Sequence, residues 1–197
     1  MSLFGTIRAF AARGIEISGV RRVVEAVDLL RALPSAPAAR WVAPTKLHVT
    51  MKFFGEIDAG VAPALRDSLA AISLVARAPR LAFSGFSAFP SRERARVVFA
   101  EVEDMGGETA ALATSVQSAA EALGFPPETR AFHPHLTVAR TAEPVDTLAW
   151  LAGAASWRVV ALCPELVLYR SDTSRPGAEY EALGRFALLP RKSKKGG

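Results

Sequence analysis

The sequence predicts an α+β protein in which two pseudo-symmetric lobes of mainly antiparallel sheet carry helices on the outside and face a central cleft. Helical periods alternate with pairs of strand-like runs joined by short loops, which favours antiparallel pairing over a doubly wound parallel sheet. The order strand, helix, strand, strand occurs twice, and no Gly/Ser-rich linker separates the two copies. We therefore expect one bilobal domain over residues 1–190 and a disordered basic tail over residues 191–197.

The first half of the chain opens with a strand and a helix. An apolar run predicts a strand over 6–12, and apolar residues at helical spacing predict a helix over 20–33 that ends before Pro34. The first copy of the repeat then comprises a strand at 47–55, a helix at 61–76, and two strands at 80–89 and 95–102.

The second half follows the same order. A helix over 108–123 ends at Gly124, a residue type that often follows the last helical turn. Both copies of the repeat begin with a histidine two residues before a threonine. The second copy comprises a strand at 132–140, a short helix at 145–151, a strand region at 157–170 and a final strand at 178–189.

Composition limits the kinds of partner. The chain has 197 residues, 50% of them hydrophobic, which is enough for a full core and excludes a disordered binding segment. Its formal net charge is +5, but the tail contributes four cations, so that 20 basic residues face 19 acidic ones in the rest of the chain. Any phosphate-binding surface should therefore be a local patch. The four tail cations are Arg191, Lys192, Lys194 and Lys195.

Cysteine usage and the N-terminal residues indicate the compartment. The lone cysteine, Cys163, excludes an internal disulfide and a thiolate zinc cluster, which is typical of a reducing environment. Residues 1–17 contain no long apolar run after a charged segment, so we expect neither a signal peptide nor a membrane span. We expect a cytoplasmic monomer that has no membrane contact and needs no protein partner.

The strongest functional signal is a pair of His-x-Thr elements. The chain has three histidines, and two of them begin such elements, at His48/Thr50 and His135/Thr137. Side chains two apart on a strand point to the same face, so each element presents an imidazole beside a hydroxyl. One element alone would fit a core histidine beside a strand former. Two elements, each at the head of a repeat, favour a catalytic pair.

Two imidazoles suit the opening of a cyclic phosphodiester. One neutral imidazole can take a proton from water, and a protonated one can give a proton to the departing ribose oxygen. An ordinary histidine pKa of about 6.5 makes both forms accessible near neutral pH. The hydroxyls of Thr50 and Thr137 can donate hydrogen bonds to the non-bridging phosphate oxygens. This chemistry requires no cofactor and no metal.

Nearby side chains are candidates for binding phosphate or RNA. Arg140 follows Thr137 by three residues, and Lys52 follows Thr50 by two, which places Lys52 on the same predicted face. Arg130 lies just before the second His-x-Thr strand. Phe132 is a candidate for stacking on a base, although core packing is the simpler expectation.

Two other kinds of function remain open at this point. The spacing His133-x-His135, together with His48, would complete a three-histidine zinc site of a metal-dependent phosphodiesterase. That site would explain neither threonine, and no acidic residue is placed to orient its ligands. The second alternative is a catalytically silent module that binds a nucleotide or an RNA end in the same cleft.

These elements resemble the two-histidine phosphoesterase superfamily, and within it the RNA 2′,3′-cyclic phosphodiesterases, also called 2′-5′ RNA ligases. The resemblance covers nearly the whole chain. Four segments carry it: WVAPTKLHVTMKFFGEID, FHPHLTVAR, LYRSDTSRPGAEYEAL and, more loosely, IRAFAARGIE.

The resemblance implies hydrolysis of an RNA 2′,3′-cyclic phosphate to a 2′-phosphate end, with 2′-5′ ligation as the reverse reaction. It implies that His48 donates a proton to the 3′ oxygen and that His135 is the base that activates water. Two features depart from the family pattern. Lys52 stands where an arginine is often found, and the lysine-rich tail is not a family feature.

Overall fold

A computed structural model of the protein describes residues 5–173 and 178–190. The strands are β1 (Thr6–Gly14), β2 (Arg40–Trp41), β3 (His48–Asp58), β4 (Arg80–Phe89), β5 (Ala95–Asp104), β6 (His135–Val145), β7 (Arg158–Leu162), β8 (Glu165–Asp172) and β9 (Glu179–Ala187). The α-helices are α1 (Ile17–Arg31), α2 (Ala62–Ser73), α3 (Glu108–Ala122) and α4 (Leu148–Ala152), and short 3-10 turns lie at Pro44–Lys46 and Ala59–Val61.

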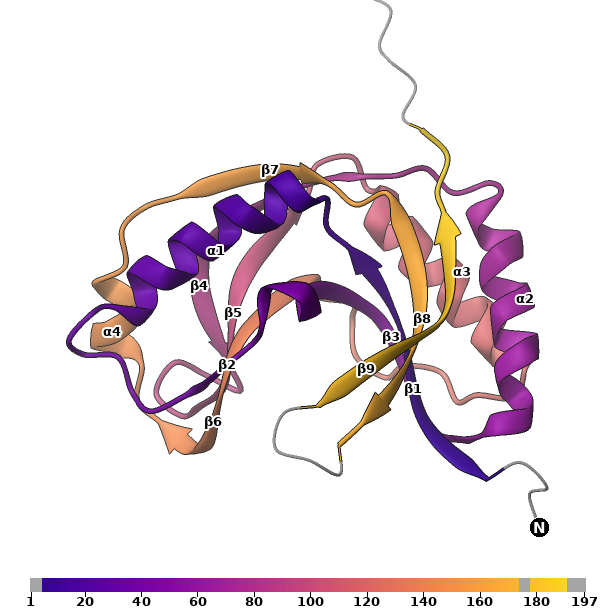
Figure 1. The fold of residues 1–197 in the computed structure, drawn as a ribbon, viewed down its shortest axis with the longest axis horizontal. Helices are drawn as coiled ribbons and strands as arrows, with labels where there is room; N and C mark the ends of the chain where they lie inside the picture. Colours follow the sequence, from indigo (N-terminus) through magenta and orange to yellow (C-terminus); the bar gives the residue numbers. More distant parts are fainter. Residues whose placement is uncertain (1–4, 174–177, 191–197) are drawn as a thin grey trace, which may run out of the picture.

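The named strands form one nine-stranded sheet in which every pairing between them is antiparallel. Its order is β7-β4-β5-β6-β3-β1-β8-β9, and β2 pairs with β6 (Figure 1). A single residue pair, Val49 with Leu136, joins β3 to β6. We call the strands on either side the β3 half (β3-β1-β8-β9) and the β6 half (β7-β4-β5-β6). The predicted α+β class is confirmed.

Helices lie against both halves of the sheet. Helix α2 contacts β8 and β9, α3 contacts β3 and also β5 of the other half, and α1 contacts β7 (Figure 1). The indole Nε1 of Trp150 in α4 donates to the carbonyl of Leu30 in α1 at 2.9 Å, which ties these two helices together. Val49 and Leu136 are fully buried in the core. The residues on either side of them in the two His-x-Thr elements therefore lie on the opposite face of the sheet.

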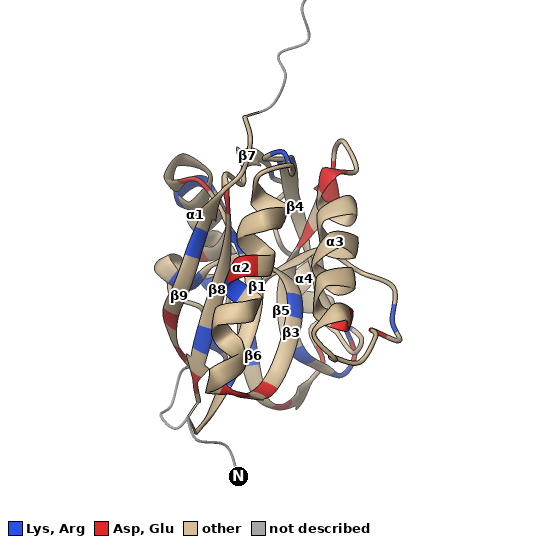
Figure 2. Cartoon of the chain, turned by 90° about the vertical axis from the view of Figure 1, so that its right-hand side faces the viewer, with Lys and Arg blue, Asp and Glu red and all other residues tan. Residues whose placement is uncertain are grey.

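Charges of both signs are interspersed over the strands. Figure 2 shows basic and acidic positions along β8 and β9, where Arg170 pairs with Glu181 and Arg185 pairs with Glu165. This distribution agrees with the nearly neutral charge expected for the chain without its tail. Within the described residues, no helix has the length and apolar character needed to cross a membrane.

Most predicted elements are present, with three corrections. The region 157–170 is two strands, β7 and β8, because the chain turns at Cys163 and Pro164 between them. The second His-x-Thr strand begins at His135 and extends to Val145, so the short helix that follows begins only at Leu148. The predicted tail at 191–197 and the turn at 174–177 lie outside the described residues.

The third correction concerns the repeat, because neither copy builds one half of the sheet. In the first copy, β3 lies in the β3 half and the hairpin of β4 and β5 lies in the β6 half. In the second copy, β6 and β7 lie in the β6 half, whereas β8 and β9 lie in the β3 half. The two copies therefore exchange strands, and this exchange brings their two opening strands together at the centre of the sheet.

Candidate active site

The two His-x-Thr elements meet on one face of the sheet. Because Val49 pairs with Leu136 in an antiparallel ladder, the same register sets His48 opposite Thr137 and Thr50 opposite His135. The two imidazoles are then diagonal neighbours, which on adjacent strands lie about 7–8 Å apart. We call this side of the sheet the histidine face.

The same local hydrogen bond fixes both rings. His48 Nδ1 lies 2.7 Å from the carbonyl oxygen of Lys46, and His135 Nδ1 lies 2.9 Å from the carbonyl oxygen of His133. A carbonyl oxygen can only accept, so each Nδ1 carries the hydrogen and donates it. Each Nε2 is therefore left without a hydrogen in the neutral ring, ready to accept or carry the transferred proton.

Neither threonine hydroxyl of the two elements is used within the part of the chain that the structure describes. Thr50 and Thr137 are half-buried, and their hydroxyls make no hydrogen bond with any other described residue. Both hydroxyls are thus free to donate to a ligand between the imidazoles.

A β-bulge follows each His-x-Thr element. In β3, Thr50 pairs with Ala12 and Lys52 pairs with Ala11, so Met51 is an extra residue. In β6, Thr137 pairs with Phe99 and Ala139 with Val98, so that strand gains an extra residue too.

Each bulge reverses the alternation of side chains beyond it. Consecutive residues are buried at Met51 and Lys52, and again at Val138 and Ala139. The next residue on the histidine face is therefore five positions after the histidine in both elements. In β6 this residue is Arg140, and in β3 it is Phe53, which pairs with Phe10.

The expected position of Lys52 on the histidine face is wrong. The bulge turns its side chain to the helix-covered side, where it is 4% exposed and its Nζ lies 3.3 Å from Glu128 Oε1. Phe53 takes the place that regular alternation assigned to Lys52, with 54% of its surface exposed. No sequence signal marks this exchange, because a bulge depends on the partner strand.

Aromatic rings from its own half surround His48. Its ring centroid lies 5.0 Å from that of Phe10 and 5.5 Å from that of Tyr180, and Tyr169 is 6.2 Å away. The sequence did not single out these three residues, although the segment LYRSDTSRPGAEYEAL, which carries part of the family resemblance, contains both tyrosines. Their strands, β1, β8 and β9, are distant in sequence from His48 and become its neighbours only in the folded sheet.

His135 packs against a smaller aromatic pair in the other half. Phe89 and Phe99 stack at 4.2 Å and meet the His135 ring edge-on at 5.1 and 5.5 Å. His133 is exposed just before β6, with its ring 6.4 Å from that of His135. Within residues 5–173 and 178–190, no three His, Cys, Asp or Glu side chains group as metal ligands, so the three-histidine site considered from sequence is not formed.

The site lowers the basicity of both histidines. Burial lowers the pKa of His48 to about 4, and the positive charges of Arg140 and His135 add to the effect, whereas the bond to the Lys46 carbonyl opposes it. Burial also lowers the pKa of His135, and His133 and Arg140 contribute in the same direction. Arg140 therefore lies within electrostatic reach of both rings.

The two other binding candidates lie before the site. Arg130 and Phe132 are exposed in the loop that precedes β6, and Phe132 keeps 36% of its surface accessible. Neither side chain makes a hydrogen bond, ion pair or ring contact with another described residue. Their roles in RNA binding stay predictions.

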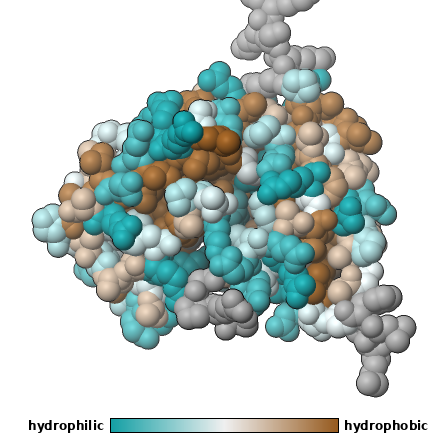
Figure 3. Space-filling model, viewed as in Figure 1, coloured by the Kyte–Doolittle hydropathy of each residue, from teal (hydrophilic) through white to brown (hydrophobic). Residues whose placement is uncertain are grey.

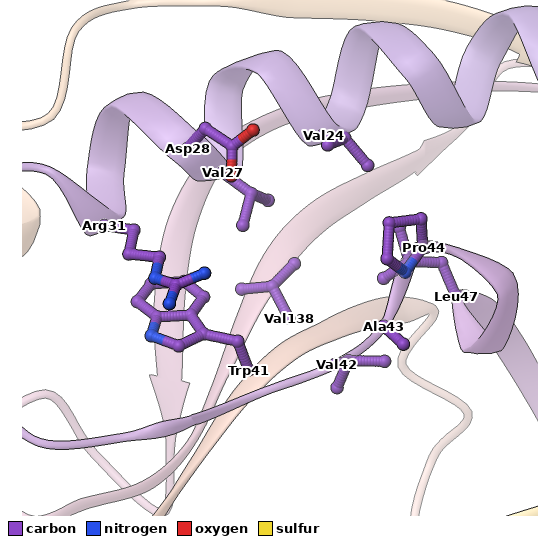
Figure 4. Close-up of a pocket in the computed structure, with 10 residues that line it drawn as sticks. All are labelled: Val24, Val27, Asp28, Arg31, Trp41, Val42, Ala43, Pro44, Leu47 and Val138. Carbon is purple, nitrogen blue, oxygen red and sulfur yellow. The ribbon is translucent and has the colours of Figure 1, made fainter.

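An apolar hollow of about 220 Å³ lies away from the histidine face, between α1 and the chain that leads into β3 (Figure 4). Figure 3 shows the apolar surface below α1 that surrounds this hollow. It contains no histidine, serine, threonine or cysteine, and Asp28 is its single carboxylate. Its lining is Val24, Val27, Asp28, Arg31, Trp41, Val42, Ala43, Pro44, Leu47 and Val138.

Comparison with known proteins identifies the family. The family model described as LigT like Phosphoesterase matches residues 16–99 and 101–179. An RNA 2′,3′-cyclic phosphodiesterase from Methanothermobacter thermautotrophicus is 33% identical, over 92% of this chain and 99% of that protein. An RNA 2′,3′-cyclic phosphodiesterase from Geobacillus stearothermophilus is 30% identical over 79% of this chain, which spans only 49% of that relative's length.

Structural comparison agrees. The crystal structure of E. coli LigT complexed with 3′-AMP superposes with a TM-score of 0.69 at 26% identity, covering 93% of this chain and 99% of that one. The family-level resemblance predicted from the two His-x-Thr segments is confirmed. The chain belongs to the LigT-like phosphoesterase family.

Proposed function

We propose that this protein hydrolyses RNA ends that carry a 2′,3′-cyclic phosphate and leaves a 2′-phosphate, by general acid–base catalysis between His48 and His135. The observation that carries the proposal is the pair of free Nε2 atoms on one sheet face, each beside an unused threonine hydroxyl. The relatives named RNA 2′,3′-cyclic phosphodiesterase and the LigT complex with 3′-AMP support the substrate class.

The reaction needs two proton transfers. Nε2 of His135 takes a proton from water as the water oxygen bonds to phosphorus, and the bond between phosphorus and the 3′ oxygen breaks. Nε2 of His48 gives its proton to that oxygen, which becomes the 3′-hydroxyl. Thr50, Thr137 and Arg140 stabilise the negative charge that grows on the non-bridging oxygens. A 5′-hydroxyl in place of water would give a 2′-5′ linkage, which is the ligation direction.

Substrate binding supplies the proton that the donor needs. With both pKa values below 6.5, both rings are neutral at pH 7 in the free protein. A phosphodiester monoanion between the rings offsets the positive charge of Arg140 and favours the protonated form of His48. The donor therefore becomes charged in the complex, where its proton is used.

The test is a product assay on a short oligoribonucleotide that ends in a 2′,3′-cyclic phosphate. We expect a single product with a 2′-phosphate and a 3′-hydroxyl, identified by ³¹P NMR against synthetic 2′- and 3′-phosphate standards. The reaction is run with and without a chelator. Binding without product would support a silent module, a 3′-phosphate product would exclude the assigned bond cleavage, and loss of activity on chelation would exclude the proposed mechanism.

A further inference from the structure

Strand β2 places a second arginine next to the site. Its two residues pair with β6 so that Arg40 lies directly opposite Arg140. Residues directly opposite each other in an antiparallel pair point to the same face, so Arg40 joins Arg140 on the histidine face. Like charges in this position destabilise a sheet unless something offsets their repulsion.

No acidic group of the described residues offsets this repulsion. Both arginines are exposed, and neither makes an ion pair or a hydrogen bond with another residue in the described ranges. The one carboxylate of β6, Glu143, is paired with Arg96 at 3.5 Å. Elsewhere on the sheet Arg158 pairs with Glu103 at 2.8 Å, so cross-strand compensation is available in this fold but is absent at the arginine pair.

The pair begins at the site and extends away from it. Arg140 follows Thr137 by three residues, a distance of at most about 10 Å along a strand, and its charge reaches both imidazoles. Arg40 lies beside Arg140 on the neighbouring strand β2. In the other half, the matching position is Phe53, which carries no charge. Arg40 therefore extends the positive charge of Arg140 on the β6 side of the site.

We propose that Arg40, next to Arg140, binds the internucleotide phosphate that precedes the cyclic phosphate, so that the protein prefers oligoribonucleotide ends to cyclic mononucleotides. This inference rests on the proposed function. A guanidinium group matches phosphate oxygens in a bidentate geometry, and a phosphodiester anion bound by Arg40 would also offset its repulsion with Arg140. A cyclic mononucleotide has no second phosphate and cannot use Arg40.

The experiment compares kcat/KM for adenosine 2′,3′-cyclic monophosphate and for the dinucleotide ApA with the same cyclic end. We expect the wild type to prefer the dinucleotide and Arg40→Ala to reduce that preference about tenfold, the usual effect of losing one hydrogen bond to a charged group. Arg40→Gln is a second variant of similar size. Arg21→Ala, which removes an exposed arginine of α1, is the matched control and should retain the wild-type preference.

An Arg40→Ala protein with an unchanged preference, or with equal losses on both substrates, would overturn the inference while leaving the hydrolysis intact. A wild type that cleaves neither substrate would refute the proposed function, and the inference with it. Thermal unfolding of the variants controls for folding. We expect an unchanged or raised Tm for Arg40→Ala, because the repulsion with Arg140 is removed.

Discussion

The two His-x-Thr elements have the same backbone and different surroundings. In both, the Nδ1 hydrogen is donated to the carbonyl two residues before the histidine, and a bulge follows the threonine. The fifth position after the histidine then differs, with Phe53 in β3 and Arg140 in β6. His48 lies among three aromatic rings of the β3 half, whereas His135 meets the edges of two.

This difference makes the two copies of a symmetric motif unequal, as the asymmetric reaction we propose requires. The motif gives each half a correctly oriented ring and a hydroxyl, but it does not distinguish the acid from the base. Neighbours that come from other strands make that distinction through burial and charge. They also give the site one charged end and one aromatic end.

The largest expected effect comes from removing either imidazole. His48→Asn and His135→Asn should each reduce kcat by about two to four orders of magnitude, the usual contribution of general acid–base catalysis. The two variants should differ in their pH profiles. Without the donor, the fall in kcat/KM at alkaline pH should disappear, and without the base, the fall at acidic pH should disappear.

The wild-type profile provides the reference for this comparison. Its optimum should lie below pH 6.5, because both pKa values are lowered and the active form has one ring protonated and one neutral. If His48→Asn instead lost the fall at acidic pH and His135→Asn lost the fall at alkaline pH, the assigned roles of acid and base would be reversed. Activity near the wild-type level in either variant would contradict acid–base catalysis by this pair.

The next effect compares Arg140 of β6 with Phe53, which takes the equivalent position in β3. Arg140→Ala should lower kcat/KM about 10- to 1000-fold, because it removes a charged donor to the transition-state phosphate. Phe53→Ala should cost less than about tenfold, since it removes at most one stacking contact. Both are measured on the same cyclic dinucleotide. A larger loss for Phe53→Ala would mean that the aromatic end holds the reacting phosphate.

The smallest effect concerns Lys52, which the bulge removes from the histidine face. Lys52→Met keeps the length of the side chain and should leave kcat/KM within about twofold of the wild type, since in the proposed mechanism the phosphate contacts other groups. The free energy of unfolding reports separately on the loss of the pair with Glu128. A large fall in kcat/KM with unchanged stability would return Lys52 to the phosphate site.

Sequence patterns predicted most helices and strands, and they predicted that the two histidines and two threonines lie together. Helical and alternating periods are local, so they identified all four α-helices to within a few residues and most of the strands. The two histidines and two threonines followed from a repeated tetrapeptide in which the intervening residues, Val49 and Leu136, are apolar. The patterns missed the split between β7 and β8, because both strands are apolar and the turn between them is short.

The sequence by itself determined which residues we propose for the chemistry, because a histidine and a threonine two apart on a strand share a face whatever the rest of the fold is. Only the tertiary structure decided how the two elements meet and what surrounds them. Strand exchange between the repeats places β3 beside β6. The bulges put Phe53, in place of Lys52, and Arg140 on the histidine face. Pairing, bulges and burial depend on partners distant in the chain, so no local pattern contains them.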